Sequence, residues 1–233
     1  MRRTVTWVCA MAVVLGTLSI RAMAQADTTA PREAPQTFRL ELDGSEQKQP
    51  SWIILVQSDG TGLYWPTLTA KFGQIPVRLS EATWKRVHGG AAAIEGNRCE
   101  TKQKNIAKTG MKDVDYQGGA TGSPDATCTF NYSDDAGLND AVAALESMVS
   151  TMQFGDRLQH ELRYDRLGLD AEIDSLAEEV KNGSAIEAQN IAPVLQSLID
   201  DDRVMERVKR KAAHLLEGAG IAVKNYTPEP SAR

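Results

Sequence analysis

The side chains that could carry acid–base catalysis are few and far apart in the sequence. There are three histidines, His88, His160 and His214. Only His160 stands among acids, with Glu161 and Asp165 in the run HELRYD. A hydrolytic site needs a nucleophile, a base and a group that orients the base within hydrogen-bonding reach. HELRYD is predicted to lie on an amphipathic helix, where charges three or four residues apart form surface ion pairs, so we assign it no catalytic role.

Motifs that bind metals, phosphates or dinucleotides are missing from the sequence. It has no His-Glu-x-x-His, paired Cys-x-x-Cys, Gly-x-Ser-x-Gly or glycine-rich phosphate loop. Asp113 and Asp115 imitate the start of a calcium loop, but Pro124 occupies the twelfth position, where a bidentate Glu is required. We predict no catalytic residue, no metal site and no cofactor. A rival hypothesis is a secreted hydrolase whose site assembles from distant residues, first among them Asp113, Asp115, His160 and Asp165.

The N-terminal segment, residues 1–26, has the layout of a secretory signal peptide. Arg2 and Arg3 precede an apolar run over 5–20, and small residues follow at the spacing a signal peptidase accepts. The run is short for a membrane-spanning helix, which needs about 20 residues. An uncleaved anchor is the alternative. We predict export to the periplasm or the extracellular space, with no transmembrane segment after cleavage.

Export would place the remaining cysteines, Cys99 and Cys128, in an oxidising compartment. A disulfide between them is the default expectation there. Closing a loop of about 30 residues stabilises a fold by roughly 3–4 kcal/mol through the entropy of the unfolded chain. Two buried free thiols are the alternative.

A basic cluster lies between the two cysteines, and its members are Lys102, Lys104, Lys108 and Lys112. We predict that these lysines bind an anion or dock on the acidic helical part of the chain. Solvated surface lysines are the alternative interpretation.

The charge balance argues against nucleic-acid binding. Without residues 1–26 the chain keeps 31 acids and 23 of its 26 bases, which gives a net charge of −8. Proteins that bind duplex nucleic acid usually have the opposite sign. Residues 134–217 hold 18 acids against 9 bases, so nearly all of the negative charge falls on the helical part.

Residues 37–133 are predicted to form a small antiparallel sheet with one packed helix. Short strands are predicted at 38–42, 52–56, 63–65, 77–79, 112–116 and 128–132. The uninterrupted apolar run at 52–56 indicates a strand covered on both faces. Cys128, Phe130 and Tyr132 are predicted to share a core-facing side of the last strand. Ser80 is a predicted helix N-cap, and Gly89-Gly90 weakens or ends that helix.

Residues 134–217 are predicted to be all-helical, because the apolar period changes from two to about 3.6. Helices are expected at 138–152, resuming at 158–162 after a break at Phe154-Gly155, and at 169–180, 186–199 and 204–215. Asn182-Gly183 predicts a left-handed C-cap, and Pro193 a bend or a fresh start. Asp200, Asp201 and Asp202 are expected at the positive end of the last helix, with Lys209 to Lys211 toward its negative end.

The predicted fold class is therefore α+β, a small antiparallel sheet with a packed helix followed by an all-helical C-terminal part. Residues 27–36 are predicted to be a disordered leader and 218–233 a flexible tail.

Two stretches carry a resemblance. DGTGLYW followed by a helix at LSEATW resembles small secreted bacterial domains of unknown function, over roughly residues 37–152. IAPVLQSLIDDDRVMERVKRKAAHLL resembles a single HEAT-type helical repeat. Because stacking needs about three repeats, that likeness implies a helical hairpin and not a HEAT array.

Together these patterns predict an exported, non-enzymatic binding or envelope-associated interaction protein. Its partner is expected to be another protein or an envelope component. The alternatives are the secreted hydrolase described above and a purely structural component. The sequence indicates neither the identity of the partner nor the oligomeric state.

Overall fold

The computed structural model describes residues 35–45, 50–67, 73–105, 107, 110–118, 125–224 and 226. The predicted signal peptide, most of the predicted leader, Lys108 and the last residues of the chain lie outside this part.

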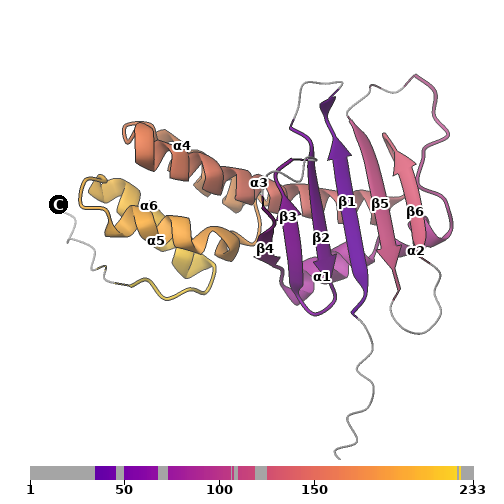
Figure 1. Cartoon of the computed structure of the whole chain (residues 1–233), viewed down its shortest axis with the longest axis horizontal. Coiled ribbons are helices and arrows are strands. Elements are labelled where there is room, and N and C mark those ends of the chain that lie inside the picture. The colour runs from indigo at the N-terminus through magenta and orange to yellow at the C-terminus, as the bar shows by residue number, and fades with distance from the viewer. Residues whose placement is uncertain are drawn as a thin grey trace, which may run out of the picture. The chain divides into compact units, whose positions relative to one another are not determined.

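Six strands form one antiparallel sheet in the order β4-β3-β2-β1-β5-β6 (Figure 1). Their bounds are β1 Thr37–Asp43, β2 Trp52–Gln57, β3 Thr61–Trp65, β4 Ile75–Arg78, β5 Met111–Gln117 and β6 Ala126–Phe130. Every neighbouring pair is antiparallel. With the helices that follow, this arrangement confirms the predicted α+β class.

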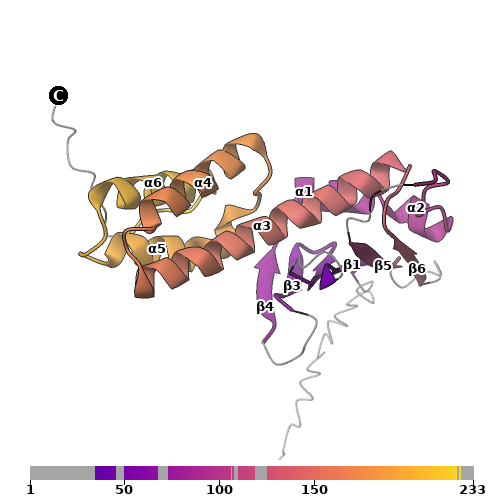
Figure 2. The same ribbon diagram turned by 90° about the horizontal axis from the view of Figure 1, so that it is seen from above.

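Helices cover one face of the sheet. Alternate residues of each strand, such as Phe38, Leu40 and Ile54, are fully buried on that face. α1 (Glu81–His88), α2 (Ala91–Glu95) and the first half of α3 (Ala136–Tyr164) lie over it (Figure 2).

The opposite face of the sheet has no described helix over it. The prediction that β2 is covered on both faces is wrong, because Ile53 and Leu55 are only half-buried. Their apolar character is explained by lateral neighbours on β3, where Ile53 pairs with Trp65 and Leu55 with Leu63. Cross-strand pairs of this kind stabilise a sheet without a second layer.

α1 begins and ends where its sequence predicts. The Ser80 hydroxyl accepts a hydrogen bond from the Thr83 backbone N–H at 3.2 Å, which caps the first turn. The helix ends at Gly89-Gly90. A Cβ at Gly90 would lie 2.9 Å from the Cβ of Ala141, so this glycine also allows α3 to approach closely.

α3 is one continuous helix of 29 residues, and the predicted break at Phe154-Gly155 is wrong. A Cβ at Gly155 would lie 2.5 Å from Cγ2 of Ile191. The glycine therefore permits close packing of a neighbouring segment and does not interrupt the helix. The first half of α3 packs on the sheet part and its second half on the C-terminal helices, so both parts belong to the single compact unit Glu33–Arg233.

The C-terminal part contains α4 (Leu169–Asn182), the 3-10 helix η2 (Ala188–Ile191), α5 (Ala192–Asp200) and α6 (Glu206–Gly218). Gly183, with φ of +83°, confirms the left-handed C-cap of α4. Pro193 lies in the first turn of α5, so the chain starts afresh there. α5 and α6 pack together as a helical hairpin. None of the helices within the described ranges is long and apolar enough to cross a membrane.

The charges around α6 do not serve the helix dipole as predicted. Asp200 ends α5, and Asp201 accepts hydrogen bonds from Arg203, so the acidic run belongs to the connection between helices. On α6, Lys211 contacts Asp170 and Asp174 of α4 at 3.2 and 2.5 Å. Arg207 and Lys211 of α6 thus form ion pairs with α4. The sequence does not indicate this pairing because the partners are far apart along the chain.

The flexible tail was predicted to begin at residue 218, but residues beyond α6 still contact the helical part. Lys224 exchanges two backbone hydrogen bonds with the Gln196 side chain on α5, and the Tyr226 hydroxyl donates to Glu206 at 2.6 Å. The chain after α6 therefore runs back over the helical hairpin for several residues.

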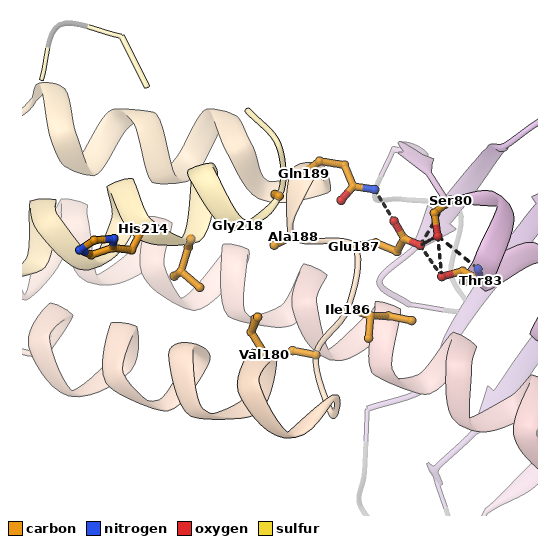
Figure 3. Close-up of a pocket in the computed structure, with 12 residues that line it drawn as sticks. Ser80, Thr83, Val180, Ile186, Glu187, Ala188, Gln189, His214 and Gly218 are labelled. Atoms are coloured by element: carbon orange, nitrogen blue, oxygen red, sulfur yellow. Dashed lines mark hydrogen bonds between the residues drawn. The ribbon is translucent and has the colours of Figure 1, made fainter. Parts of the chain in front are cut away.

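Side chains of the segment before and within η2 join the helical part to the edge of the sheet. Asn190 pairs with the backbone of Arg78 at the edge of β4, accepting from its N–H at 2.7 Å and donating to its C=O at 2.8 Å. Glu187 accepts hydrogen bonds from Ser80 and Thr83 at the start of α1 (Figure 3). An edge strand would otherwise expose unpaired backbone groups. At Arg78 the Asn190 amide makes the two hydrogen bonds that a neighbouring strand would make.

Candidate functional site

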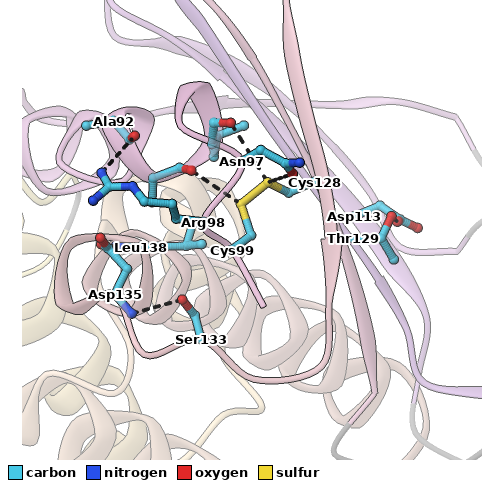
Figure 4. Close-up of a disulfide and its surroundings, with 12 residues drawn as sticks. Ala92, Asn97, Arg98, Cys99, Asp113, Cys128, Thr129, Ser133, Asp135 and Leu138 are labelled. Carbon is cyan, nitrogen blue, oxygen red and sulfur yellow. Dashed lines mark hydrogen bonds between the residues drawn. A yellow bond between two sulfur atoms is a disulfide. The ribbon is translucent and has the colours of Figure 1, made fainter. Parts of the chain in front are cut away.

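The predicted pairing of Cys99 with Cys128 agrees with the structure, in which the two sulfur atoms are at bonding distance, 1.96 Å (Figure 4). Cys128 lies on the core-facing side of β6, and Cys99 follows α2. The bond therefore ties the end of α2 to an edge strand. Tyr132 does not share that face, because β6 ends at Phe130 and Tyr132 is 46% exposed.

The structure separates Lys112 from Lys102 and Lys104, three of the four lysines that were predicted to bind an anion. Lys102 and Lys104 are exposed in the segment after Cys99, and Lys108 lies outside the described residues. Lys112 is buried on the core-facing side of β5, with its Nζ 3.8 Å from a Glu146 carboxylate oxygen on α3. Burial raises the pKa of Glu146, and the charge of Lys112 opposes that rise. Lys112 is thus a buried cation that pairs with a partly exposed acid of the covering helix α3.

The residues of the rival hydrolase hypothesis also do not converge. On β5, Asp113 accepts a hydrogen bond from Thr129, and Asp115 lies 2.9 Å from the Arg39 guanidinium. His160 packs its ring against Tyr164 near the end of α3, and Asp165 accepts from the Leu167 N–H in the turn that follows. Two of the four thus lie on the open sheet face and two at the end of a helix that packs on the other face. Over the described ranges, no group of three or more His, Cys, Asp or Glu side chains is placed to hold a metal ion.

The open face of the sheet is apolar on one side. Ile53 and Leu55 of β2 lie beside Trp65 and Leu63 of β3, and Pro76 of β4 pairs with Leu63. The aliphatic and aromatic side chains of this group are half-buried, so they remain in contact with solvent. We call these five residues the apolar half.

The other side of the same face is acidic. Glu41 of β1 pairs in register with Asp113 of β5, and Arg39 pairs with Asp115. The Arg39 guanidinium donates to both Glu41 and Asp115. Burial lowers the pKa of Arg39, but the hydrogen bonds and charges of Glu41 and Asp115 together outweigh it and raise the pKa. These four residues, three carboxylates and one guanidinium that contacts two of them, are called the acidic half.

A shallow cleft of about 230 Å³ marks the meeting of the two halves. Its lining includes Arg39 and Asp115 from the acidic half, Leu55 from the apolar half, and Asp125 just before β6. The sequence predicts that Asp113 and Asp115 point away from Val114. It does not reveal the apolar half, because a run such as 52–56 is equally typical of a strand buried on both faces.

Fold and surface together define an α+β protein with a disulfide and a sheet of which the described helices cover one face. Comparison with protein-family models, with curated proteins and with solved structures finds no match.

Proposed function

We propose that this protein is an exported, non-enzymatic binding protein whose open sheet face binds a basic amphipathic segment of another secreted or envelope protein. The observation that carries the proposal is the division of one solvent-facing sheet surface into an apolar half and an acidic half.

The apolar half supplies the driving force for binding. Burying apolar surface contributes about 25 cal/mol per Å², and contiguous apolar patches on soluble proteins are typical of interaction sites. Leu63 lies centrally in this half, with Leu55 on one side and Pro76 on the other. A partner that places leucine-like side chains there would remove these groups from water.

The acidic half favours a partner with positive charge. The Arg39 guanidinium pairs with Glu41 and Asp115, and Asp113 adds a third carboxylate, so the four residues of the acidic half carry an excess of negative charge. Complementary charge speeds association and excludes partners of like charge. A segment with lysine or arginine along one side and apolar residues along the other satisfies both halves.

The absence of convergence among Asp113, Asp115, His160 and Asp165 supports binding over hydrolysis. The test is alanine at all four positions. Loss of turnover on any substrate, with the fold retained by circular dichroism, would replace the binding proposal by the hydrolase hypothesis.

The binding proposal itself is tested with two labelled helical peptides of equal length, one built from leucine and lysine and the other from leucine and glutamate. Fluorescence anisotropy should detect saturable binding of the basic peptide only. The double variant Asp113→Asn/Asp115→Asn should weaken binding by about tenfold, because exposed charge pairs contribute up to about 1 kcal/mol each. Leu63→Ala should weaken it by a similar factor through lost apolar contact.

The matched control is Glu178→Gln/Asp202→Asn, which changes the net charge by the same amount on exposed positions of the helical part. It should leave the affinity unchanged. Equal binding of both peptides, equal losses in the control, or dimerisation of the protein through this face in sedimentation experiments would each overturn the proposal.

A further inference from the structure

A second concave site lies at the junction of the sheet part and the helical part, away from the open sheet face. It is a cavity of about 380 Å³, within the size range of small-molecule sites. Its walls come from four places in the fold: the start of α1, the last turn of α4, residues 185–189, and the last turns of α6 (Figure 3).

Small and apolar side chains form most of the lining and keep the cavity open. Ala185, Ala188 and Ala219 contribute only methyl groups, and Val180 and Leu215 add aliphatic surface. Gly218 also lines it, and a Cβ built at this glycine would meet nothing within 4 Å. There is therefore unfilled space at the end of α6 that a larger side chain could occupy.

The polar groups of the cavity favour positive charge in a ligand. Among the described residues that line it, none is lysine or arginine, Glu187 is the carboxylate, and His214 is the other titratable side chain. Burial raises the pKa of Glu187, but hydrogen bonds donated by Thr83, Gln189 and Ser80 outweigh it and lower the pKa. Its negative charge is thus present at neutral pH, while the hydrogen-bond donors Ser80, Thr83 and Gln189 are uncharged.

The helices around the cavity add to this potential. Val180 belongs to the last turn of α4, and Leu215 and Gly218 belong to the last turn of α6. The C-terminal end of a helix carries a partial negative charge. The N-terminal end of α1, which would attract an anion, is already occupied by the Glu187 carboxylate.

We infer that this cavity is a binding site for a small organic cation, an amine with a short aliphatic body. The ammonium group would lie toward Glu187 and the helix C-termini, and the aliphatic part would pack on the alanine, valine and leucine side chains. Because its walls come from both parts of the fold, the bound amine would contact α1 and the C-terminal helices at once. This site is independent of the protein-binding face proposed above.

The test uses the full mature protein labelled with ¹⁵N and three probes of equal chain length: hexylammonium, hexanoate and hexanol. Titration with hexylammonium should give saturable amide shifts centred on residues 185–189 and the end of α6. Hexanoate and hexanol should bind at least about tenfold more weakly, because a charge-assisted hydrogen bond is lost.

Two variants and one control test whether hexylammonium binds in this cavity. Gly218→Leu fills the open space and should weaken hexylammonium binding at least about fivefold, without strain because Gly218 ends a helix with room for a side chain. Glu187→Gln should remove the preference for the cation. Ala171→Leu, at an exposed position of α4, is the matched control and should change nothing.

The inference is overturned if hexylammonium gives no saturable shifts, if hexanoate or hexanol binds as tightly, or if Gly218→Leu leaves the affinity unchanged. Retained cation preference in a folded Glu187→Gln variant would overturn the role given to that carboxylate. Should Glu187→Gln not fold, the Gly218→Leu comparison still decides the site.

Discussion

Replacing Gly155 by alanine tests whether this glycine is a packing residue or a helix breaker. In a continuous helix with free space, Gly→Ala stabilises by up to about 1 kcal/mol. Here the added methyl would lie 2.5 Å from Cγ2 and 3.2 Å from Cβ of Ile191, much closer than carbon atoms normally approach. Overpacking of this kind costs about 1–3 kcal/mol. We therefore expect a net loss of about 1–2 kcal/mol in the free energy of unfolding.

The assay is urea denaturation followed by circular dichroism, with a double-mutant cycle. Ile191→Ala removes the clashing atoms and is destabilising by itself, because Ile191 is buried. In the Ile191→Ala background, Gly155→Ala should become neutral or stabilising, so the two changes should couple by at least about 1 kcal/mol. Gly218→Ala, at a helical glycine with no atom within 4 Å, is the matched control and should not destabilise.

An additive cycle would refute this reasoning. A Gly155→Ala variant as stable as the parent protein would also refute it. That result is expected if the helix is interrupted at Phe154-Gly155 and Ile191 does not pack against residue 155.

Three further predictions concern export, acid stability and the sheet edge. The exported protein should have lost residues 1–26 in an intact-mass measurement and should resist alkylation without reductant; Cys99→Ser should cost about 3–4 kcal/mol of stability. Because the folded-state pKa of Glu187 is lowered, its stabilising contribution is complete above the unfolded-state pKa and is lost as pH falls through the folded-state value. Glu187→Gln should therefore flatten the acid side of a stability–pH curve, and an unchanged slope would contradict the shift. Asn190→Ala removes both hydrogen bonds to Arg78 and should cost about 1–2 kcal/mol, with faster amide exchange at Arg78; unchanged exchange there would mean that Asn190 does not protect the β4 edge.

Sequence patterns were sufficient for local features of the fold. Ser80 as an N-cap, Gly183 as a left-handed C-cap and the alternation around Val114 each depend on a few adjacent residues. Their physical causes, a side chain that accepts a backbone N–H, a positive φ and a strand with two faces, act within one turn or one strand. The disulfide between Cys99 and Cys128 could be predicted because the sequence has three cysteines and the third, Cys9, lies in the predicted signal peptide.

The candidate binding face was predicted only in part. The outward direction of Asp113 and Asp115 follows from alternation. Their placement beside Arg39 and Glu41 requires the pairing of β1 with β5, strands that are far apart in the chain. The apolar half was missed because the sequence of β2 does not tell which of its faces a helix covers.

The sequence by itself determined the periodicities, the caps, the acidic character of the helical part and the pairing of the cysteines, because each depends on residue type and short spacing. Only the tertiary structure decided what Gly155, Lys112 and Glu187 do. Gly155 leaves room for Ile191, the buried Lys112 pairs with Glu146 of α3, and Glu187 joins the helical part to the start of α1. The physical reason is that each of these roles is set by a neighbour at least 34 residues away, and close packing and charge pairing depend on distance in space.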